Sequence, residues 1–203
     1  MTVVPRMLIL SGSTRSGSYN TLLARIAEQL LQEAGAKTAL INLTDFDMPI
    51  YNGDIQQQLG IPAPAMALKQ QFKEADGLLF ASPEHNMSPS ALLKNTIDWV
   101  SRATAHESGK VPFEGKAAAL CSASTGGLGG QRGLLHLRLM LTGLGMHVLP
   151  AVVGIGNAAT AFDANGQLKD QSQVSALRSL AQSAVELTRR LHATASGARN
   201  ESK

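Results

Sequence analysis

The feature that most constrains the fold is a regular alternation between short apolar runs and longer segments with helical periodicity. The apolar runs have the length of buried β-strands and lie at residues 7–11, 38–43, 77–82, 117–122 and 148–153. Between and after them, apolar residues recur every three or four positions, which predicts helices over about 20–35, 65–75, 90–102, 132–143 and 172–191. Five strands alternating with five helices predict a parallel α/β sheet that is covered by helices on both faces.

The chain length suits one such domain. A chain of 203 residues can bury a full core, and the sequence shows neither an internal repeat nor a linker. We expect one domain over residues 1–192 and, because residues 193–203 are small and polar, a flexible C-terminal tail over 193–203. Within the domain, residues 44–62 carry prolines and an Asn-Gly pair, which predicts a long loop.

Composition argues against several classes of partner. No apolar run approaches the roughly 20 residues that span a bilayer, and the N-terminus lacks the apolar stretch of a signal peptide. The net charge is +3, but the basic residues are scattered and aromatic residues make up only 4%, which disfavours nucleic-acid binding. The single cysteine, Cys121, excludes an internal disulfide and fits a reducing cytoplasm. The histidines show no metal-ligand spacing, so we expect no metal site.

Three unusual loops follow three of the predicted strands. Ligands of open α/β sheets bind outside the carboxyl ends of the strands, where the strand order reverses. The first loop, residues 11–20, is rich in hydroxyls and leads into a helix N-terminus, where free N–H groups and the helix dipole favour an anion. Ser18 or Asn20 as a simple helix cap is the alternative, although the loop holds more hydroxyls than a cap needs. The lysine of a nucleoside-triphosphate loop is absent, so a single terminal phosphate fits best.

The second and third loops suit a planar heterocycle. Residues 82–89 carry two prolines and several polar groups, which makes a rigid turn with fixed donors and acceptors; His85 within it could equally be a solvated surface residue. Residues 122–130 include four glycines, so their uncovered N–H groups could stabilise negative charge, or the segment could be a flexible surface loop. A loose match of residues 154–159 to G-x-G-x-x-A is attributed to chance, because a polar stretch follows it.

Together the loops resemble the NAD(P)H-dependent FMN reductases of the flavodoxin-like superfamily, which includes soluble quinone, chromate and azo-dye reductases. The first loop is similar to G-S-x-R-x-x-S-x-N, and Pro83–Asn86 is close to P-E-Y-N. Leu93-Lys94-Asn95, Ile97-Asp98-Trp99 and the small-residue loop from Ser122 complete a match over about residues 7–155. The resemblance implies an α/β flavodoxin-like fold, with a five-stranded parallel sheet of order 2-1-3-4-5, and non-covalently bound FMN that NADPH or NADH reduces.

The resemblance also assigns residues to the cofactor site. The FMN phosphate would contact the first loop, which contains Ser13, Arg15, Ser18, Tyr19 and Asn20. The isoalloxazine would lie between two further sets of residues, which are Pro83, Glu84, His85 and Asn86 on one edge and Ser124, Thr125, Gly126 and Gly127 on the other. Because the flavin carries the chemistry, no protein acid or base is strictly required. His85 stands where the family usually has tyrosine, and it could give a proton to a quinone oxygen.

We therefore expect an oxidoreductase that passes hydride from NAD(P)H through FMN to a small acceptor by a ping-pong mechanism. The acceptor could be a quinone, a flavin, an azo compound or a metal oxyanion. The resemblance implies a homodimer or homotetramer, in which residues 44–62 and 103–113 could complete a neighbour's site and Trp99 could be an interface anchor or a core residue.

Two alternatives stay open. A flavodoxin-like carrier would pass electrons to protein partners, but such carriers tend to be strongly acidic and this chain is basic. A serine hydrolase would use Ser124 in a sequence similar to a nucleophile elbow, with Asp163 and His192 following in chain order.

Overall fold

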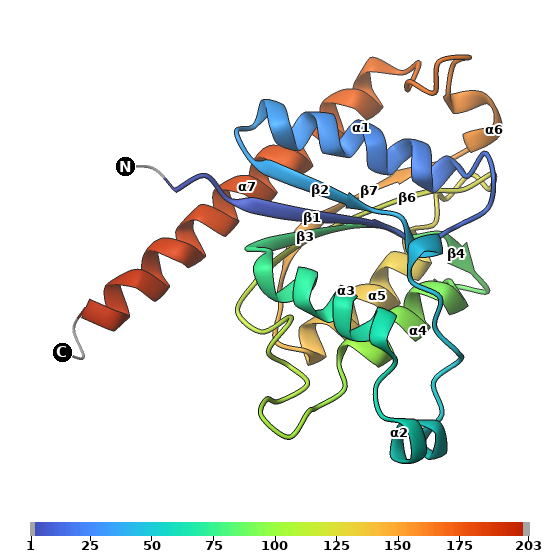
Figure 1. The fold of residues 1–203 in the computed structure, drawn as a ribbon. Coiled ribbons are helices and arrows are strands. Elements are labelled where there is room, and N and C mark those ends of the chain that lie inside the picture. Colours follow the sequence, from blue (N-terminus) through green and yellow to red (C-terminus); the bar gives the residue numbers. More distant parts are fainter. Residues whose placement is uncertain (1–2, 201–203) are drawn as a thin grey trace.

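The protein folds around one parallel sheet, and the computed structural model describes residues 3–200, with side chains up to residue 194. Its five strands, in the spatial order β2-β1-β3-β6-β7 (Figure 1), are β2 (Lys37–Ile41), β1 (Arg6–Ser11), β3 (Gly77–Ala81), β6 (Ala117–Ala123) and β7 (His147–Ile155). All four neighbouring pairs are parallel. The predicted α/β fold and strand order 2-1-3-4-5 are confirmed.

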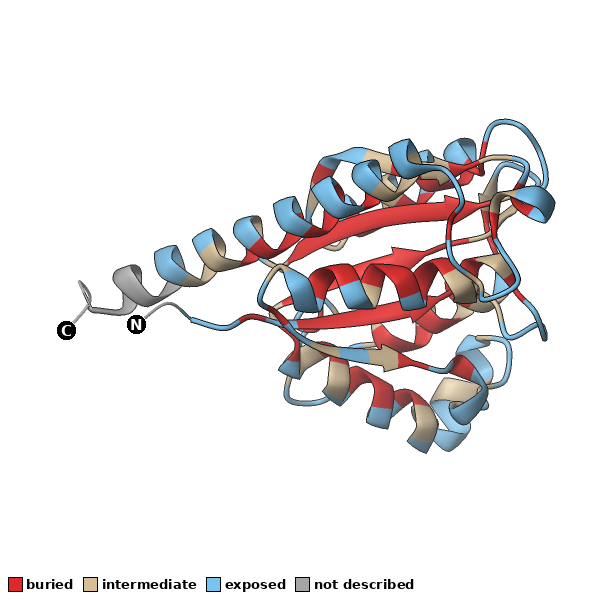
Figure 2. Ribbon diagram, turned by 90° about the horizontal axis from the view of Figure 1, so that it is seen from above, coloured by how far each residue is buried: buried red, intermediate tan, exposed pale blue. Residues whose placement is uncertain are grey.

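Helices cover both faces of the sheet (Figure 1), as the alternation predicted. One face packs against α1 (Tyr19–Glu33) and α7 (Gln171–Asn200). The other face packs against α3 (Ala63–Glu74), α4 (Ala91–Val100) and α5 (Gln131–Gly143). The central strands are therefore buried on both sides, as Figure 2 shows.

Strand periodicity divides the core into two layers. Along β1, Met7 and Ile9 point to the face of α1 and α7, whereas Leu8 and Leu10 point to the face of α3 and α4. β3 and β6 alternate in the same way, so each helix packs against side chains from several strands. This arrangement fixes the three loops at the carboxyl ends of β1, β3 and β6.

Short elements interrupt two segments that were predicted to be loops. Residues 44–62 contain part of a 3-10 turn, η1 (Leu43–Asp45), and a helix, α2 (Gly53–Leu59), so the expected long loop is wrong in part. Asn52 does not form a turn with Gly53; its side chain caps α2 by accepting from the Asp54 N–H at 2.8 Å. Because α2 buries no residue, it has no apolar period that would reveal it. Two strands, β4 (Glu84–His85) and β5 (Ser88–Pro89), form a hairpin, and α6 (Ala158–Ala161) follows β7.

The last helix is longer than expected. It was predicted to end near Leu191, but α7 continues to Asn200 and projects beyond the sheet (Figure 1). The division into a domain over 1–192 and a flexible tail over 193–203 stays a prediction, and residues 201–203 lie outside the described residues. None of the helices within residues 3–200 has both the length and the apolar character that a membrane span needs.

Candidate functional site

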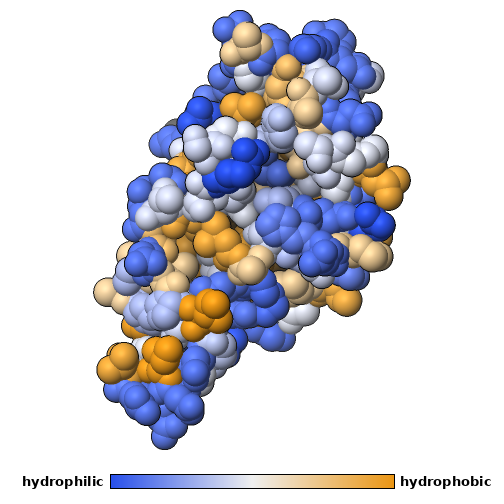
Figure 3. All heavy atoms as spheres, turned by 90° about the vertical axis from the view of Figure 1, so that its right-hand side faces the viewer, coloured by the Kyte–Doolittle hydropathy of each residue, from blue (hydrophilic) through white to orange (hydrophobic). Residues whose placement is uncertain are grey.

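The three unusual loops meet at one edge of the sheet. The chain passes from β1 to β2 on one side, while β3 lies on the other, so the strand order reverses at β1. The loops after β1, β3 and β6 therefore lie side by side at the carboxyl ends of the strands, on the right in Figure 1. Figure 3 views this edge directly and shows a hydrophilic to neutral centre with hydrophobic patches beside and below it.

A cavity of about 300 Å³ opens between these loops. It is lined by Ser13, Arg15, Ser18, Tyr19, Asn20, Pro83, Glu84, His85, Ala123, Ser124 and Thr125. Thus every predicted site residue lines this cavity except Asn86, Gly126 and Gly127, which lie in the same loops. The structure brings together segments that are far apart in the sequence.

The first loop leaves several backbone donors unpaired at the start of α1. Ser18 caps α1, and its hydroxyl accepts from the Thr21 N–H at 3.3 Å. The backbone N–H groups of Thr14, Ser16 and Gly17 donate to no acceptor among residues 3–200. These donors are therefore available to a ligand.

Arg15 folds back over the first loop. Its guanidinium donates to the Ser16 and Gly17 carbonyls at 3.1 Å each, and it lies 5.8 Å from the centre of the Tyr19 ring. The Tyr19 ring in turn stacks on Phe162, with centroids 5.8 Å apart. Arg15 therefore holds its positive charge at the mouth of the loop, where a phosphate would be neutralised.

Asn20 ties the first loop to the third. Its amide donates to the Ala123 carbonyl at 2.8 Å and accepts from the Ala123 N–H at 2.9 Å, and the residue is only 5% exposed. Both ends of the amide are therefore engaged by the backbone at the end of β6. In this arrangement Asn20 positions the two loops that border the cavity.

The second loop is a tight hairpin. Asn86 and Met87 form its tip with φ angles of 50° and 64°, the pair of positive values that a type I′ turn requires. The loop also packs closely on the first one, because a Cβ atom on Gly12 would lie 2.9 Å from Cδ of Pro83. Ser90, the N-cap of α4, donates to the Gly12 carbonyl and fixes this contact.

Glu84 serves mainly to hold helix α5. The N-cap of α5 is Gly130, which has no side chain to offer, and the Glu84 carboxylate replaces it by accepting from the Gly133 N–H at 2.9 Å. Arg132 donates to the same carboxylate at 3.0 and 3.2 Å. Burial alone would raise the pKa of Glu84, but the hydrogen bonds from Gly133 and Arg132 outweigh it and hold the pKa below its usual value.

The third loop rests on the end of β7. Ser124 accepts from the Gly126 N–H at 3.2 Å, and its own N–H donates to the Ile155 carbonyl at 2.9 Å. A Cβ atom on Gly156 would lie 2.5 Å from the Gly127 carbonyl oxygen, and one on Gly154 would lie 3.0 Å from that of Gly129. The match of residues 154–159 to G-x-G-x-x-A was attributed to chance, but Gly154 and Gly156 have a packing role: they let the third loop approach the end of β7. Two glycines at a strand end were the sequence signal for such a close approach.

The motif on α4 supports the segment after β2. Asn95 accepts from the Tyr51 N–H at 2.8 Å and donates to the Pro49 carbonyl at 3.0 Å. Trp99 donates to the same carbonyl at 2.7 Å and is fully buried. Trp99 is therefore a core residue, and the interface anchor alternative is wrong.

The hydrolase alternative is excluded by position. His192 pairs with Asp76 at 2.7 Å, and Asp76 directly precedes β3, at the amino edge of the sheet. Ser124 follows β6 at the carboxyl edge, so no Ser124–His192 pair exists. Cys121 is no substitute nucleophile, because complete burial raises the pKa of its thiol to about 12.

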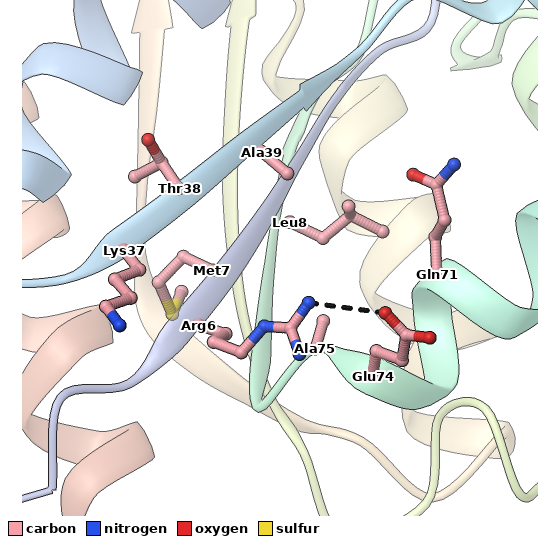
Figure 4. Close-up of a pocket in the computed structure, with 9 residues that line it drawn as sticks. All are labelled: Arg6, Met7, Leu8, Lys37, Thr38, Ala39, Gln71, Glu74 and Ala75. Atoms are coloured by element: carbon pink, nitrogen blue, oxygen red, sulfur yellow. Dashed lines mark hydrogen bonds and ion pairs between the residues drawn. The ribbon is translucent and has the colours of Figure 1, made fainter.

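A further cavity of about 330 Å³ lies at the amino edge of β1 and β2, beside α3 (Figure 4). Arg6 and Glu74 face each other across it and form an ion pair of 3.3 Å between exposed side chains. None of the predicted site residues lines this cavity. Because the pair is exposed, it contributes little to stability.

Comparison with known proteins agrees with the fold and the loops. Residues 5–160 match the family described as NADPH-dependent FMN reductase. The NAD(P)H-dependent FMN reductase of Pseudomonas aeruginosa is 42% identical over 168 residues, which cover 81% of this chain and 85% of that protein. A quinone reductase of Escherichia coli is 36% identical over 144 residues, which cover 71% of this chain and 73% of that protein.

Comparison with solved structures also finds a flavoenzyme with a similar fold. FerB, a flavoenzyme NAD(P)H:(acceptor) oxidoreductase from Paracoccus denitrificans, has a TM-score of 0.76 at 25% identity, over 92% of this chain and 98% of that chain. The predicted oxidoreductase class, with FMN as cofactor and NAD(P)H as reductant, is confirmed at the level of the family. The chain belongs to the NADPH-dependent FMN reductase family.

Proposed function

We propose that this protein holds FMN in the cavity between the three loops and catalyses the NAD(P)H-dependent reduction of a small acceptor. The observation that carries the proposal is that the hydroxyl-rich loop after β1, the rigid hairpin and the start of the glycine-rich loop line one cavity. Ser13 and Arg15 would hold the phosphate together with the N–H groups of Thr14, Ser16 and Gly17, which line an adjoining cavity that shares Ser13, Arg15 and Ser18 with the first. Pro83 and His85 would border one edge of the ring, and Ser124 and Thr125 the other.

The protein would orient the ring and stabilise charge, since bound FMN supplies the two-electron chemistry. The N–H groups of the third loop that have no acceptor among the described residues, such as that of Thr125, would stabilise the negative charge of the reduced ring. His85 is exposed beside the cavity, so it would be the proton donor to an acceptor such as a quinone. We propose a ping-pong order, in which reductant and acceptor bind in turn, because both must reach the same flavin in this cavity.

Quinones are the first acceptor class to test, because several relatives are quinone reductases. Free flavin, azo compounds and metal oxyanions remain further acceptor classes. Steady-state rates at several fixed quinone concentrations should give parallel double-reciprocal lines against NADPH. Intersecting lines would exclude the ping-pong order, and oxidation of NADPH only when a protein partner is added would favour the electron-carrier alternative.

We also propose a homodimer or homotetramer in the cytoplasm. Support for assembly comes from large apolar side chains in solvent, including Ile50 and Leu59, which are 85% and 81% exposed, and Leu139 on α5, which is 74% exposed. Residues 44–62 and 103–113 as parts of a neighbour's site stay a prediction. A molar mass of one chain by light scattering would contradict assembly. The proposal of a reducing compartment is supported by the single cysteine, Cys121, which is buried and forms no disulfide.

A further inference from the structure

The chain that follows β7 packs against two of the loops around the proposed FMN cavity. The Ala158 N–H donates to the carbonyl of Ser124 in the third loop at 2.9 Å. Further along, the segment passes beside the start of α1, on the right in Figure 1, where Phe162 stacks on Tyr19. Both Ser124 and Tyr19 line the cavity. Residues 156–168, which we call the post-β7 segment, therefore support the cavity from behind its lining residues.

Phe162 is held firmly within this segment. It is 8% exposed, and its backbone pairs with Leu168 in an antiparallel bridge. Asp163 closes the turn between them, because its carboxylate accepts from the Asn165 and Gln167 N–H groups at 2.8 Å each. The Phe162 ring is therefore a fixed surface for its neighbours.

The same turn also presses against α1. Gly166 has a φ of 77°, and a Cβ atom on it would lie 3.0 Å from Cδ2 of Leu22. Leu22 follows Tyr19 by three residues, so the two side chains share one face of the helix. The post-β7 segment therefore contacts α1 at Leu22 through Gly166 and at Tyr19 through Phe162.

Tyr19 links Phe162 to the charged residue of the first loop. The Tyr19 and Phe162 rings are inclined by only 10°, with centroids 5.8 Å apart, and the Arg15 guanidinium lies 5.8 Å from the centre of the Tyr19 ring. Tyr19 is half-buried, whereas Arg15 is exposed. An exposed arginine loses side-chain freedom when it binds a phosphate, and a fixed ring against it lowers that cost.

We infer that Phe162 is a positioning residue for the FMN phosphate: it fixes the Tyr19 ring, and the ring keeps Arg15 at the mouth of the first loop. Phe162 does not line the cavity, so it acts through Tyr19. The inference rests on the proposed FMN site and adds a residue to it. Phe162 lies beyond residues 5–160, the part of the chain that matches the family.

The binding test compares FMN with riboflavin, which has the same ring and no phosphate. In fluorescence titrations of the flavin-free protein, Phe162→Leu should weaken FMN binding about three- to tenfold, as expected for one aromatic stack, and leave riboflavin binding unchanged. Phe162→Tyr keeps the ring and should bind FMN as the wild type does. Phe72→Leu makes the same substitution in the core on the other face of the sheet, so it should lower stability without changing the ratio of the two Kd values.

A double variant shows whether the effect passes through Arg15. In an Arg15→Gln background, Phe162→Leu should cause no further loss of FMN affinity, because the charge that the ring positions is gone. Additive losses from the two substitutions, or an equal loss of FMN and riboflavin binding in Phe162→Leu, would overturn the inference.

A proteolysis test needs no flavin. Trypsin cleaves after the exposed Arg15, and Phe162→Leu should accelerate this cleavage several-fold, because the Tyr19 ring no longer holds the first loop in place. Cleavage after Lys110, in the remote loop that follows α4, is the internal reference and should keep its rate. An unchanged rate after Arg15 would overturn the inference. If the wild type binds no FMN, the proposed function fails, while this rate still decides whether Phe162 orders the first loop.

Discussion

Single residues of the site divide into those that face the cavity and those that hold the loops. Glu84 and Asn20 both belong to motifs that the resemblance assigns to the cofactor, yet both use their polar atoms within the protein. The sequence motifs single out both positions. The sequence could not show whether these side chains contact a ligand or hold the loops in place. Their partners, Gly133 and Ala123, are 49 and 103 residues away.

Glu84→Gln should lower the free energy of unfolding at pH 7 by about 1–3 kcal/mol, because the start of α5 loses a charged acceptor and Arg132 loses its partner. The folded-state pKa of Glu84 lies below the reference value of 4.5, so this stabilisation is present above pH 4.5 and is lost as the pH falls through the folded-state pKa. Urea unfolding at pH 7 and at about pH 3 should show a difference between wild type and variant that shrinks in acid.

Glu186→Gln is the matched control for this prediction, since it breaks an exposed ion pair on α7 and should cost less than about 0.5 kcal/mol. An equal cost for both variants at pH 7 would contradict the role assigned to Glu84.

Asn20→Asp keeps the acceptor oxygen but places a carboxylate oxygen against the Ala123 carbonyl in a buried site. We expect a loss of about 2–4 kcal/mol of stability, from the lost hydrogen bond and the buried charge. FMN affinity should fall as well, because the first and third loops are no longer held together. Urea unfolding and fluorescence titration with FMN measure the two effects. A variant of unchanged stability would contradict the role of Asn20 in joining the first and third loops.

At the level of elements, the sequence was informative for long segments and silent for short ones. The apolar runs located every strand of the sheet; the signal is strongest for β3 and β6, which are buried on both faces, whereas the edge strands β2 and β7 also carry exposed polar residues. The hairpin of β4 and β5 was recognised only as a rigid turn. Asn86 is typical of a type I′ turn, but Met87 in place of glycine hides the signal. Helix α2 was missed because it packs no apolar face.

Met87→Gly should stabilise the hairpin. Met87 adopts a φ of 64°, which costs a non-glycine residue about 1 kcal/mol, and its side chain is 48% exposed and thus loses little packing. The greater chain entropy of glycine in the unfolded state offsets part of this gain, so a net increase of about 0.5 kcal/mol and a rise in Tm of 1–2 °C are expected.

The same substitution in a helix is the control. Met66→Gly on α3, at a residue 40% exposed, should instead lower stability by about 1 kcal/mol. Calorimetric melting measures the change in Tm of both variants. A lower Tm for Met87→Gly would show that the turn is not strained at this position.

At the level of the whole molecule, the topology brings three separated motifs around one cavity. The order β2-β1-β3-β6-β7 places the ends of β1, β3 and β6 next to one another, so the first loop and the residues near 84 and 124 line one cavity. The alternation of strands and helices predicted a parallel sheet, but the strand order came from the resemblance. The hollow between the first loop and β2, which Arg25 and Asn42 both line, had no sequence signal, because these residues come to one hollow only once α1 packs beside β2.

The most direct test of the account is whether the protein binds FMN and NADPH reduces it there. The purified chain is mixed with FMN, the excess is removed, and the visible spectrum is recorded before and after anaerobic addition of NADPH. The account predicts a retained yellow flavin whose absorbance near 450 nm bleaches with NADPH. A colourless protein that also fails to oxidise NADPH in the presence of free FMN would contradict it.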